Sequence, residues 1–154
     1  GWTKKAGQCL VGSATRNDWQ LVSVVLNAPQ MWEDTMALLD YGFENYEWST
    51  IAEMGQEFAA VRVKKGESSL VKVEAAGDLR YPLLPSEEGE IRCQINLPDA
   101  VNAPLNDDDI LGEAEFFLND ELIGSVELVP MEEVKKLSVA RHFLNLWASF
   151  FNIR

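Results

Sequence analysis

Two strand-like runs, residues 8–15 and 19–27, open the chain. The second run, Leu21 to Leu26, is rich in β-branched and bulky aliphatic residues, which favour extended backbone. Asn17-Asp18 lies between the runs, and such a pair is typical of the tight turn of a β-hairpin. The pattern predicts a hairpin with one face buried against helices.

A helix is predicted after Pro29, because proline suits the first helical turn. Glu33 and Asp34 follow in that turn, where carboxylates suit the positive end of the helix dipole. Apolar side chains then recur at the spacing of one helix face. These side chains are Trp32, Met36, Leu39, Phe43 and Tyr46. We interpret this stripe as core and not as a ligand site.

Between Thr50 and Pro130, short β-rich runs alternate with turns. The runs cover residues 57–64, 69–75, 79–84, 90–96, 110–118 and 122–129. Runs repeated every ~8–12 residues predict a small antiparallel β-sandwich. The acidic run from Asn106 to Asp109 lacks the spacing of a calcium loop, so we interpret it as a solvated turn. The sequence predicts no metal site and no cofactor.

The last segment, Met131 to Arg154, is helical in period, with one broad apolar face and one polar face. A basic, aromatic-rich amphipathic helix is typical of a membrane interface, and no apolar run reaches the ~20 residues that span a bilayer. The predicted membrane-binding residues are Leu137, Phe143, Leu144, Trp147, Phe150, Phe151, Lys135 and Lys136. The same pattern fits a helix packed on the sandwich or against a second copy of itself.

The formal charge of −12 argues against nucleic acid as a partner, because phosphate binding requires clustered Lys and Arg. An acidic surface also fits solubility alone. Only the segment from residue 131 on reverses the sign, with four Lys/Arg against two Asp/Glu, which suggests a tail with its own partner. Cys9 and Cys93 each lie in an apolar strand, so we expect both to be buried like small hydrophobic residues. Their spacing matches no zinc motif, and a disulfide between them is not expected.

The first residues form a turn and a strand with no lead-in, so we expect an earlier strand to precede them in a larger protein. Gly1-Trp2-Thr3 is followed by Lys5-Ala6-Gly7 and by a strand that ends in Ser13-Ala14-Thr15. Farther on come Ala103-Pro104-Leu105 and Ile110-Leu111-Gly112. In this order the motifs resemble the C-terminal portion of a bacterial serine-type D-alanyl-D-alanine carboxypeptidase, a low-molecular-mass penicillin-binding protein, downstream of its Lys-Thr-Gly motif.

This resemblance implies an α+β fold in three parts. Residues 1–48 would be the C-terminal hairpin and helix of a penicillin-binding-protein/β-lactamase-like catalytic domain. Residues 49–130 would form a small antiparallel β-sandwich that acts as a stalk, and residues 131–154 an amphipathic membrane-anchor helix.

In the family, a serine forms an acyl-enzyme with the penultimate D-Ala, and a nearby lysine acts as base. We expect no catalytic residue in this chain, no Ser-x-x-Lys anywhere in it, and no Ser-x-Asn in the context of the family. Of the Lys-Thr-Gly motif only Gly1 remains. Gly1, Trp2 and Thr3 match the strand edge beside the family's substrate and are the expected substrate-binding residues.

The implied parent is an exported serine hydrolase at the outer face of the cytoplasmic membrane that trims peptidoglycan stem peptides. Its implied partners are the N-terminal part of the catalytic domain, peptidoglycan pentapeptide, β-lactams and the membrane surface. The alternative is a non-catalytic β-sandwich interaction module with a docking helix. In that module the first hairpin would join the sandwich, whereas in the carboxypeptidase Leu10, Val22 and Val24 would pack on the helix near Met36 and Leu39.

Overall fold

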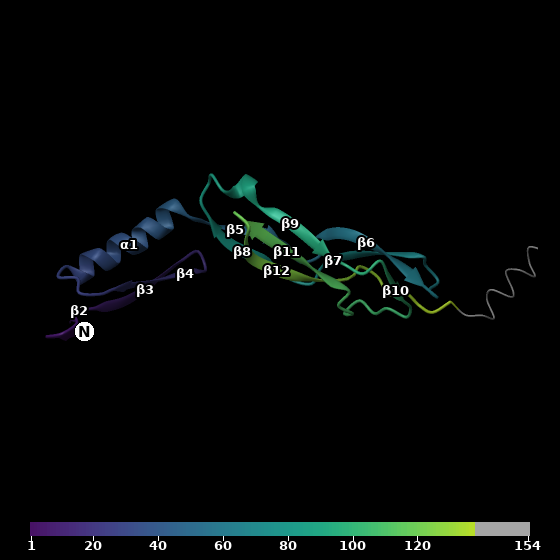
Figure 1. Ribbon diagram of the computed structural model, residues 1–154, viewed down its shortest axis with the longest axis horizontal. Helices are drawn as coiled ribbons and strands as arrows, with labels where there is room; N and C mark the ends of the chain where they lie inside the picture. The colour runs from purple at the N-terminus through teal and green to yellow at the C-terminus, as the bar shows by residue number, and fades with distance from the viewer. Residues whose placement is uncertain (138–154) are drawn as a thin grey trace, which may run out of the picture. The chain divides into compact units, whose positions relative to one another are not determined.

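The computed structural model describes residues 1–137, and this part of the chain is mostly β with one α-helix (Figure 1). It divides into two compact units, residues 1–49 with 81–89, and residues 50–80 with the chain from Glu90 on. Strands β5 (Glu47–Ala52) and β8 (Leu79–Leu83) form a two-stranded sheet, and the division falls within both strands.

The first unit is built on the predicted hairpin. Its elements are β1 (Trp2–Thr3), β2 (Gly7–Gln8), β3 (Leu10–Arg16), β4 (Trp19–Val25) and α1 (Met31–Asn45). Strands β3 and β4 pair antiparallel from Leu10↔Val25 to Arg16↔Trp19. Asn17 and Asp18 both have positive φ, 50° and 61°, as a two-residue primed turn requires. The predicted hairpin and its turn are confirmed.

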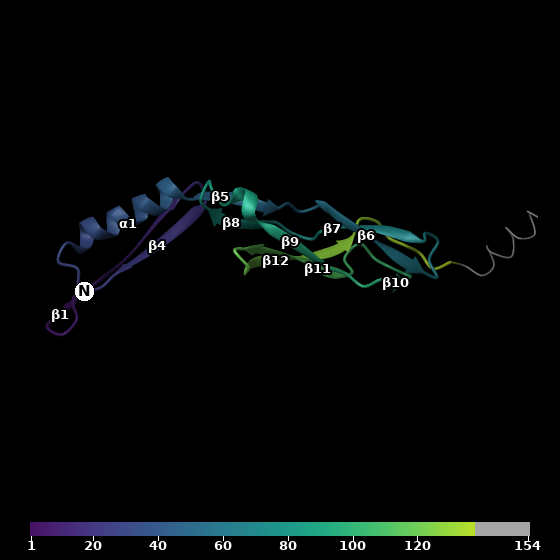
Figure 2. The ribbon, with the colours of Figure 1, turned by 45° about the horizontal axis from the view of Figure 1, so that its top comes forward.

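Helix α1 lies along the β3–β4 hairpin in both views of the ribbon (Figure 2). The expected apolar stripe is wrong for Trp32 and Met36, which are 63% and 64% exposed. Its other members, Leu39, Phe43 and Tyr46, are half-buried, and the Phe43 ring meets Trp19 of β4 at 5.4 Å. The helix instead approaches the hairpin through Thr35 and Gly42, positions where the side chain is small. A Cβ atom added to Gly42 would lie 2.5 Å from Leu21 Cδ1, so the close approach depends on glycine.

The hairpin buries one face and exposes the other. Ser23 and Val25 are buried, whereas Val11, Val22 and Val24 are 66%, 63% and 57% exposed. The expected contact of Val22 and Val24 with the helix is therefore wrong. Because both faces of β4 are aliphatic, the alternation of residues could not indicate which face meets α1.

The second unit contains one six-stranded sheet. Its strands are β6 (Glu57–Lys64), β7 (Leu70–Ala75), β9 (Arg92–Asn96), β10 (Ala100–Asn102), β11 (Gly112–Leu118) and β12 (Glu121–Pro130), and a 3₁₀ turn (Glu88–Glu90) precedes β9. They lie in the order β10-β6-β7-β12-β11-β9. The sheet folds over on itself, since Phe58 of β6 and Phe116 of β11 meet edge to face at 6.1 Å although their strands are not neighbours.

The predicted antiparallel pairing is wrong for β10, which pairs with β6 in parallel, from Ala100↔Arg62 to Asn102↔Lys64. The reason is that β9 and β10 lie at opposite edges of the sheet order, although they follow each other in sequence. The short connection through Pro98 therefore crosses to the other edge and does not make a hairpin. The other ladders of this sheet are antiparallel.

The core of the second unit lies inside the folded sheet and is almost entirely aliphatic. Its buried members are Ala52, Val61, Val63, Val71, Val73, Ala75, Ala103, Leu105, Ala114, Phe116, Val126, Leu128 and Val134. Val134, which is 3% exposed, comes from the segment that was predicted to begin the terminal helix. That segment is therefore part of the folded domain.

The predicted helix does not begin at Met131, because residues 131–137 are not helical. Val134 and Leu105 exchange backbone hydrogen bonds of 3.0 and 2.9 Å, and Leu137 N–H donates to Lys65 O at 2.8 Å. Burial of Val134 and these inter-segment bonds favour extended backbone over the helical period of the sequence. The rest of the predicted helix, residues 138–154, lies outside the described residues.

Both cysteines are free thiols. Cys93 is exposed, so its expected burial is wrong, and the reason is that β9 is an edge strand of the sheet. Partial desolvation nevertheless raises the pKa of the Cys93 thiol above its ordinary value. Cys9 is half-buried just before β3.

Candidate functional site

The expected substrate-binding residues lie together on one exposed edge of the first unit. Trp2 and Thr3 form β1, which pairs antiparallel with β2 through Trp2↔Gln8 and Thr3↔Gly7. Gly1 O accepts a hydrogen bond from Cys9 N–H at 2.7 Å, so the pairing continues to the residue before β3. The indole of Trp2 is 64% exposed and available for contact with a ligand or another part of the protein.

The turn that follows β1 is fixed by Gly7 and Thr3. Thr3 Oγ1 accepts a hydrogen bond from Ala6 N–H at 3.0 Å, which closes the turn. Gly7 has φ of +70°, and a Cβ atom there would lie 2.1 Å from Asn27 Oδ1. Both the backbone conformation and the close approach of Asn27 therefore require glycine at this position.

A shallow apolar hollow of about 230 Å³ lies between β3 and α1. It is lined by Ala14, Thr15, Arg16, Met36, Leu39, Asp40 and Phe43. The Arg16 guanidinium lies 4.6 Å over the Phe43 ring and 3.9 Å from the Asp40 carboxylate. Arg16 and Asp40 thus form the charged part of the lining, and Met36 and Leu39 contribute to its apolar part.

One exposed apolar surface of this unit was not predicted from the sequence. Val11, Val22 and Val24 lie on the face of the hairpin that points away from α1, and Leu26 beyond β4 is also exposed. A signal was present, because aliphatic residues occupy both odd and even positions of β4, which is typical of a strand covered on both faces.

The Ser-x-x-Lys spacing does occur once in the chain, at Ser69 and Lys72. Ser69 lies in the bend before β7, and Lys72 lies within that strand. Lys72 Nζ is ion-paired with Glu57 Oε2 at 2.8 Å on the exposed face of the sheet. A strand turns residues three apart to opposite faces, so this spacing does not make the one-turn pair that an activated serine needs.

The expected membrane-binding residues are described only in part. Lys135, Lys136 and Leu137 are exposed, and Gly66 and Lys136 form an isolated antiparallel bridge. Phe143, Leu144, Trp147, Phe150 and Phe151 lie outside the described residues. Among residues 1–137, no helix is long and apolar enough to cross a bilayer.

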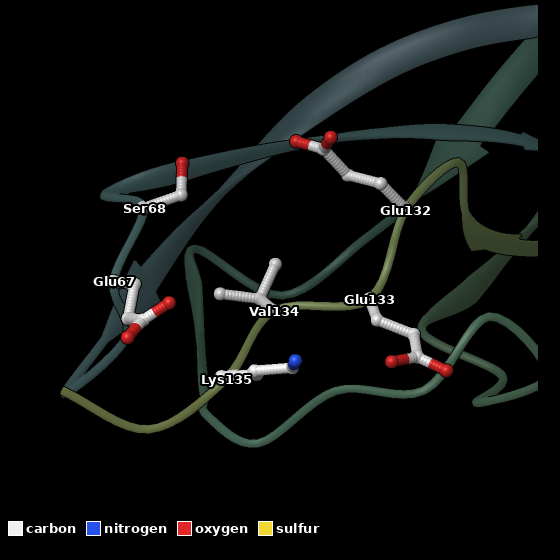
Figure 3. Close-up of a pocket in the computed structure, with 6 residues that line it drawn as sticks. All are labelled: Glu67, Ser68, Glu132, Glu133, Val134 and Lys135. Atoms are coloured by element: carbon white, nitrogen blue, oxygen red, sulfur yellow. The ribbon is translucent and has the colours of Figure 1, made fainter. Parts of the chain in front are cut away.

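A second hollow, of about 350 Å³, lies beside this segment (Figure 3). Its lining residues are Glu67, Ser68, Glu132, Glu133, Val134 and Lys135. Figure 3 shows the three carboxylates on different sides of Val134, and they do not converge on one point. Within the described part of the chain, no group of three or more His, Cys, Asp or Glu is placed to hold a metal ion.

Comparison with known proteins bears on these surfaces. Residues 46–136 match the model of the family described as penicillin-binding protein 5, C-terminal domain. The chain is 31% identical over 152 residues to D-alanyl-D-alanine carboxypeptidase DacA of Haemophilus influenzae, and the alignment covers 96% of this chain and 38% of that protein. It is 32% identical over 141 residues to D-alanyl-D-alanine carboxypeptidase DacC of Escherichia coli K12, and this alignment covers 88% of this chain and 35% of that protein.

Solved structures give the same picture. Penicillin-binding protein 5 from Haemophilus influenzae matches with a TM-score of 0.67 and 30% identity over 88% of this chain and 41% of that one. A peptidoglycan synthesis regulatory factor (PBP3) from Streptococcus pneumoniae shares the fold with a TM-score of 0.73 at 21% identity, over 88% and 42%.

The chain spans about two fifths of the length of the curated relatives that it matches. Its relatives are D-alanyl-D-alanine carboxypeptidases, and the resemblance expected from its first residues and its later motifs is confirmed. The matched region includes the six-stranded sheet together with the extended segment up to Lys136. The chain thus belongs to the family of the penicillin-binding protein 5 C-terminal domain.

Proposed function

We propose that this chain is the C-terminal part of a serine-type D-alanyl-D-alanine carboxypeptidase of the bacterial cell envelope. Residues 1–48 complete the catalytic domain and supply the edge of the active-site strand through Gly1, Trp2 and Thr3. Residues 49–130 form a stalk, and the chain after Leu137 anchors the protein at the outer face of the cytoplasmic membrane. The acyl-serine chemistry belongs to the N-terminal part of the catalytic domain.

The observation that carries this proposal is the uncovered apolar face of the β3–β4 hairpin. Val11, Val22 and Val24 leave 57–66% of their surface exposed, although each is paired within the β3–β4 ladder. Burying such a side chain contributes about 1.5–3 kcal/mol. A cluster of this kind fits the inside of a larger sheet domain better than a free surface.

The geometry at Gly1 supports the same assignment. Because Gly1 pairs with Cys9 directly before β3, a strand that ran into Gly1 would continue along the free edge of β3. A Lys-Thr pair immediately before Gly1 would then complete a Lys-Thr-Gly motif on that strand. Trp2 and Thr3 would lie at its end, on the exposed edge next to the substrate.

The alternative, a free-standing interaction module, predicts that the first hairpin joins the sandwich. Strands β3 and β4 form a separate two-stranded sheet that packs on α1, and they are not part of the six-stranded sheet. This arrangement favours the carboxypeptidase interpretation over the module.

A labelled penicillin tests the catalytic part of the proposal. The isolated chain is expected to show no covalent labelling, because the proposal assigns the activated serine and its lysine base to the N-terminal part of the catalytic domain. The protein that joins this chain to its N-terminal catalytic part is expected to be labelled. In that protein Trp2→Ala should slow acylation about tenfold or more, because it removes a contact beside the reacting peptide.

Lys5→Gln is the matched control, since Lys5 lies in the exposed turn between β1 and β2 and outside the proposed contact residues. Labelling of the isolated chain on a serine would contradict the assignment of the chemistry to the missing part. Equal acylation rates for Trp2→Ala and Lys5→Gln would contradict the role of Trp2.

Co-sedimentation with anionic liposomes tests the anchor. The full chain is expected to bind, and a chain that ends at Leu137 is expected to lose most of this binding. The truncation must begin at residue 138, because removal of Val134 would open the core of the second unit. As a control, the truncated chain should unfold thermally with the same midpoint as the full chain. Equal binding of liposomes by both chains would contradict the proposed anchor.

A further inference from the structure

The tertiary structure gathers four lysines from two segments that lie about 70 residues apart in sequence. Lys64 ends β6 and Lys65 follows it in a bend, and Lys135 and Lys136 precede Leu137. Glu67 N–H donates to Lys135 O at 2.9 Å, and Leu137 N–H donates to Lys65 O at 2.8 Å. These bonds hold both lysine pairs at the same turn, and we refer to the four residues as the lysine patch.

The lysine patch differs from the rest of the surface in charge. All four side chains are exposed, and none takes part in the ion pairs that residues 1–137 form with one another. The whole chain carries a formal charge of −12, so this concentration of positive charge is local. The nearby carboxylates of Glu67, Glu132 and Glu133 line the neighbouring hollow together with Lys135 (Figure 3).

Two exposed leucines accompany the lysines. Leu70 begins β7 opposite Arg62, near the end of β6, and is 51% exposed. Leu137 follows the patch directly and is 43% exposed. Apolar side chains beside long cationic side chains are typical of surfaces that touch lipid, because the aliphatic parts enter the interface while the amines stay at the head groups.

We propose that the lysine patch, with Leu70 and Leu137, contacts an anionic phospholipid surface, and that Lys64, Lys65 and Leu70 of the β-domain thereby extend the contact beyond the terminal segment. This inference rests on the proposed anchor, because residues 138–154 follow the patch directly and would bring it to the membrane. Its occupant is the layer of anionic head groups, whose charge is complementary to the patch. Each lysine near such a surface is expected to strengthen binding about fivefold.

The test measures partition of the full chain onto vesicles of phosphatidylcholine with phosphatidylglycerol, and onto vesicles of phosphatidylcholine alone. The double variant Lys64→Gln/Lys65→Gln is expected to bind the anionic vesicles on the order of 10- to 30-fold more weakly, with no change on the neutral vesicles. Added salt should weaken binding of the wild type more than binding of this variant. Lys64 and Lys65 are chosen because they lie far in sequence from the predicted anchor.

Lys4→Gln/Lys5→Gln is the control, since it removes the same charge from the first unit. Unchanged melting temperatures verify that both variants are folded. Wild-type binding by Lys64→Gln/Lys65→Gln, or an equal loss in the control, overturns the inference and leaves the anchor standing. If the wild type itself does not bind anionic vesicles, the anchor and the lysine patch are both overturned.

Discussion

Replacement of Phe116 by alanine is expected to lower the free energy of unfolding of the second unit by about 3–5 kcal/mol. Phe116 is 4% exposed, and its ring meets Phe58 across the folded sheet at 6.1 Å. The substitution removes a large buried side chain and leaves a cavity between the two halves of the sheet. No stronger effect of a single substitution is expected in this unit, because the other core residues are smaller.

Hydrogen exchange of the β7, β11 and β12 amides is the appropriate measurement for this change. The tryptophans among residues 1–137 are Trp2, Trp19, Trp32 and Trp48, and all of them lie in the first unit. In a Trp147→Phe background, which removes the fifth tryptophan of the chain, their fluorescence reports on the first unit and is expected to remain unchanged in Phe116→Ala.

Phe117 provides a matched control on the same strand. Its ring lies on the opposite face of the sheet, where the Arg92 guanidinium is 4.7 Å from the ring centroid. Phe117→Ala removes a partly exposed ring and one cation–π contact, so its cost is expected to be about 1 kcal/mol. Equal losses of stability for the two variants would contradict the placement of the core on the Phe116 side.

The second large effect is expected at Gly12, where the hairpin touches α1. A Cβ atom on Gly12 would lie 2.6 Å from Thr35 Cγ2, and Thr35 is itself buried. Gly12→Ala should therefore force the helix away from the hairpin and destabilise the first unit by about 1–3 kcal/mol. Urea unfolding followed by tryptophan fluorescence measures this change, because Trp19 stacks on Trp48 at 5.8 Å within the unit.

A double-mutant cycle makes this prediction specific. Thr35→Ser removes the methyl group that the new Cβ would strike and keeps the hydroxyl group. In the Thr35→Ser background, Gly12→Ala should cost at least about 1 kcal/mol less than in the wild type. Gly89→Ala is the control, since nothing lies within 4 Å of a Cβ at that position. Additive losses for Gly12→Ala and Thr35→Ser would show that the two sites do not touch.

Turns were the most predictable part of this fold. Asn17-Asp18 and Asn119-Asp120 both adopt positive φ at both positions and join paired strands, as expected for such residues. Their conformation depends on the backbone preference of two neighbouring residues and on no distant contact. The helix also begins near Pro29 as expected, with Glu33 and Asp34 in its first turn.

Faces and partners were the least predictable part. The predicted stripe is half-buried at Leu39, Phe43 and Tyr46 but exposed at Trp32 and Met36. Helix α1 approaches the hairpin most closely at Thr35 and Gly42, whose side chains are small. The apolar period indicates which face of the helix carries large apolar side chains. Close packing against this hairpin instead requires small side chains at the points of contact. The prediction that Val22 and Val24 contact the helix was also wrong, because both faces of their strand are apolar and the sequence does not indicate which face meets α1.

In the candidate site, too, local motifs were predictable from the sequence and the exposed faces were not. The order of motifs from Gly1 to Gly7 was sufficient to indicate the family, because those residues are contiguous and Gly7 is required by its local backbone. The proposal that the chemistry lies outside these residues rests on that resemblance. The uncovered face of Val11, Val22 and Val24, which carries the proposal, became visible only when the pairing of β3 with β4 showed which side chains α1 leaves exposed.

The sequence by itself determined the family, the hairpin, the helix and the turns, since each depends on neighbouring residues and their backbone preferences. Only the tertiary structure decided that Val134 completes a core and that residues 131–137 are extended. It also decided that the segment with Lys64 and Lys65 lies beside the segment with Lys135 and Lys136. Those outcomes depend on hydrogen bonds and burial between distant segments, which override the local helical period of the last segment.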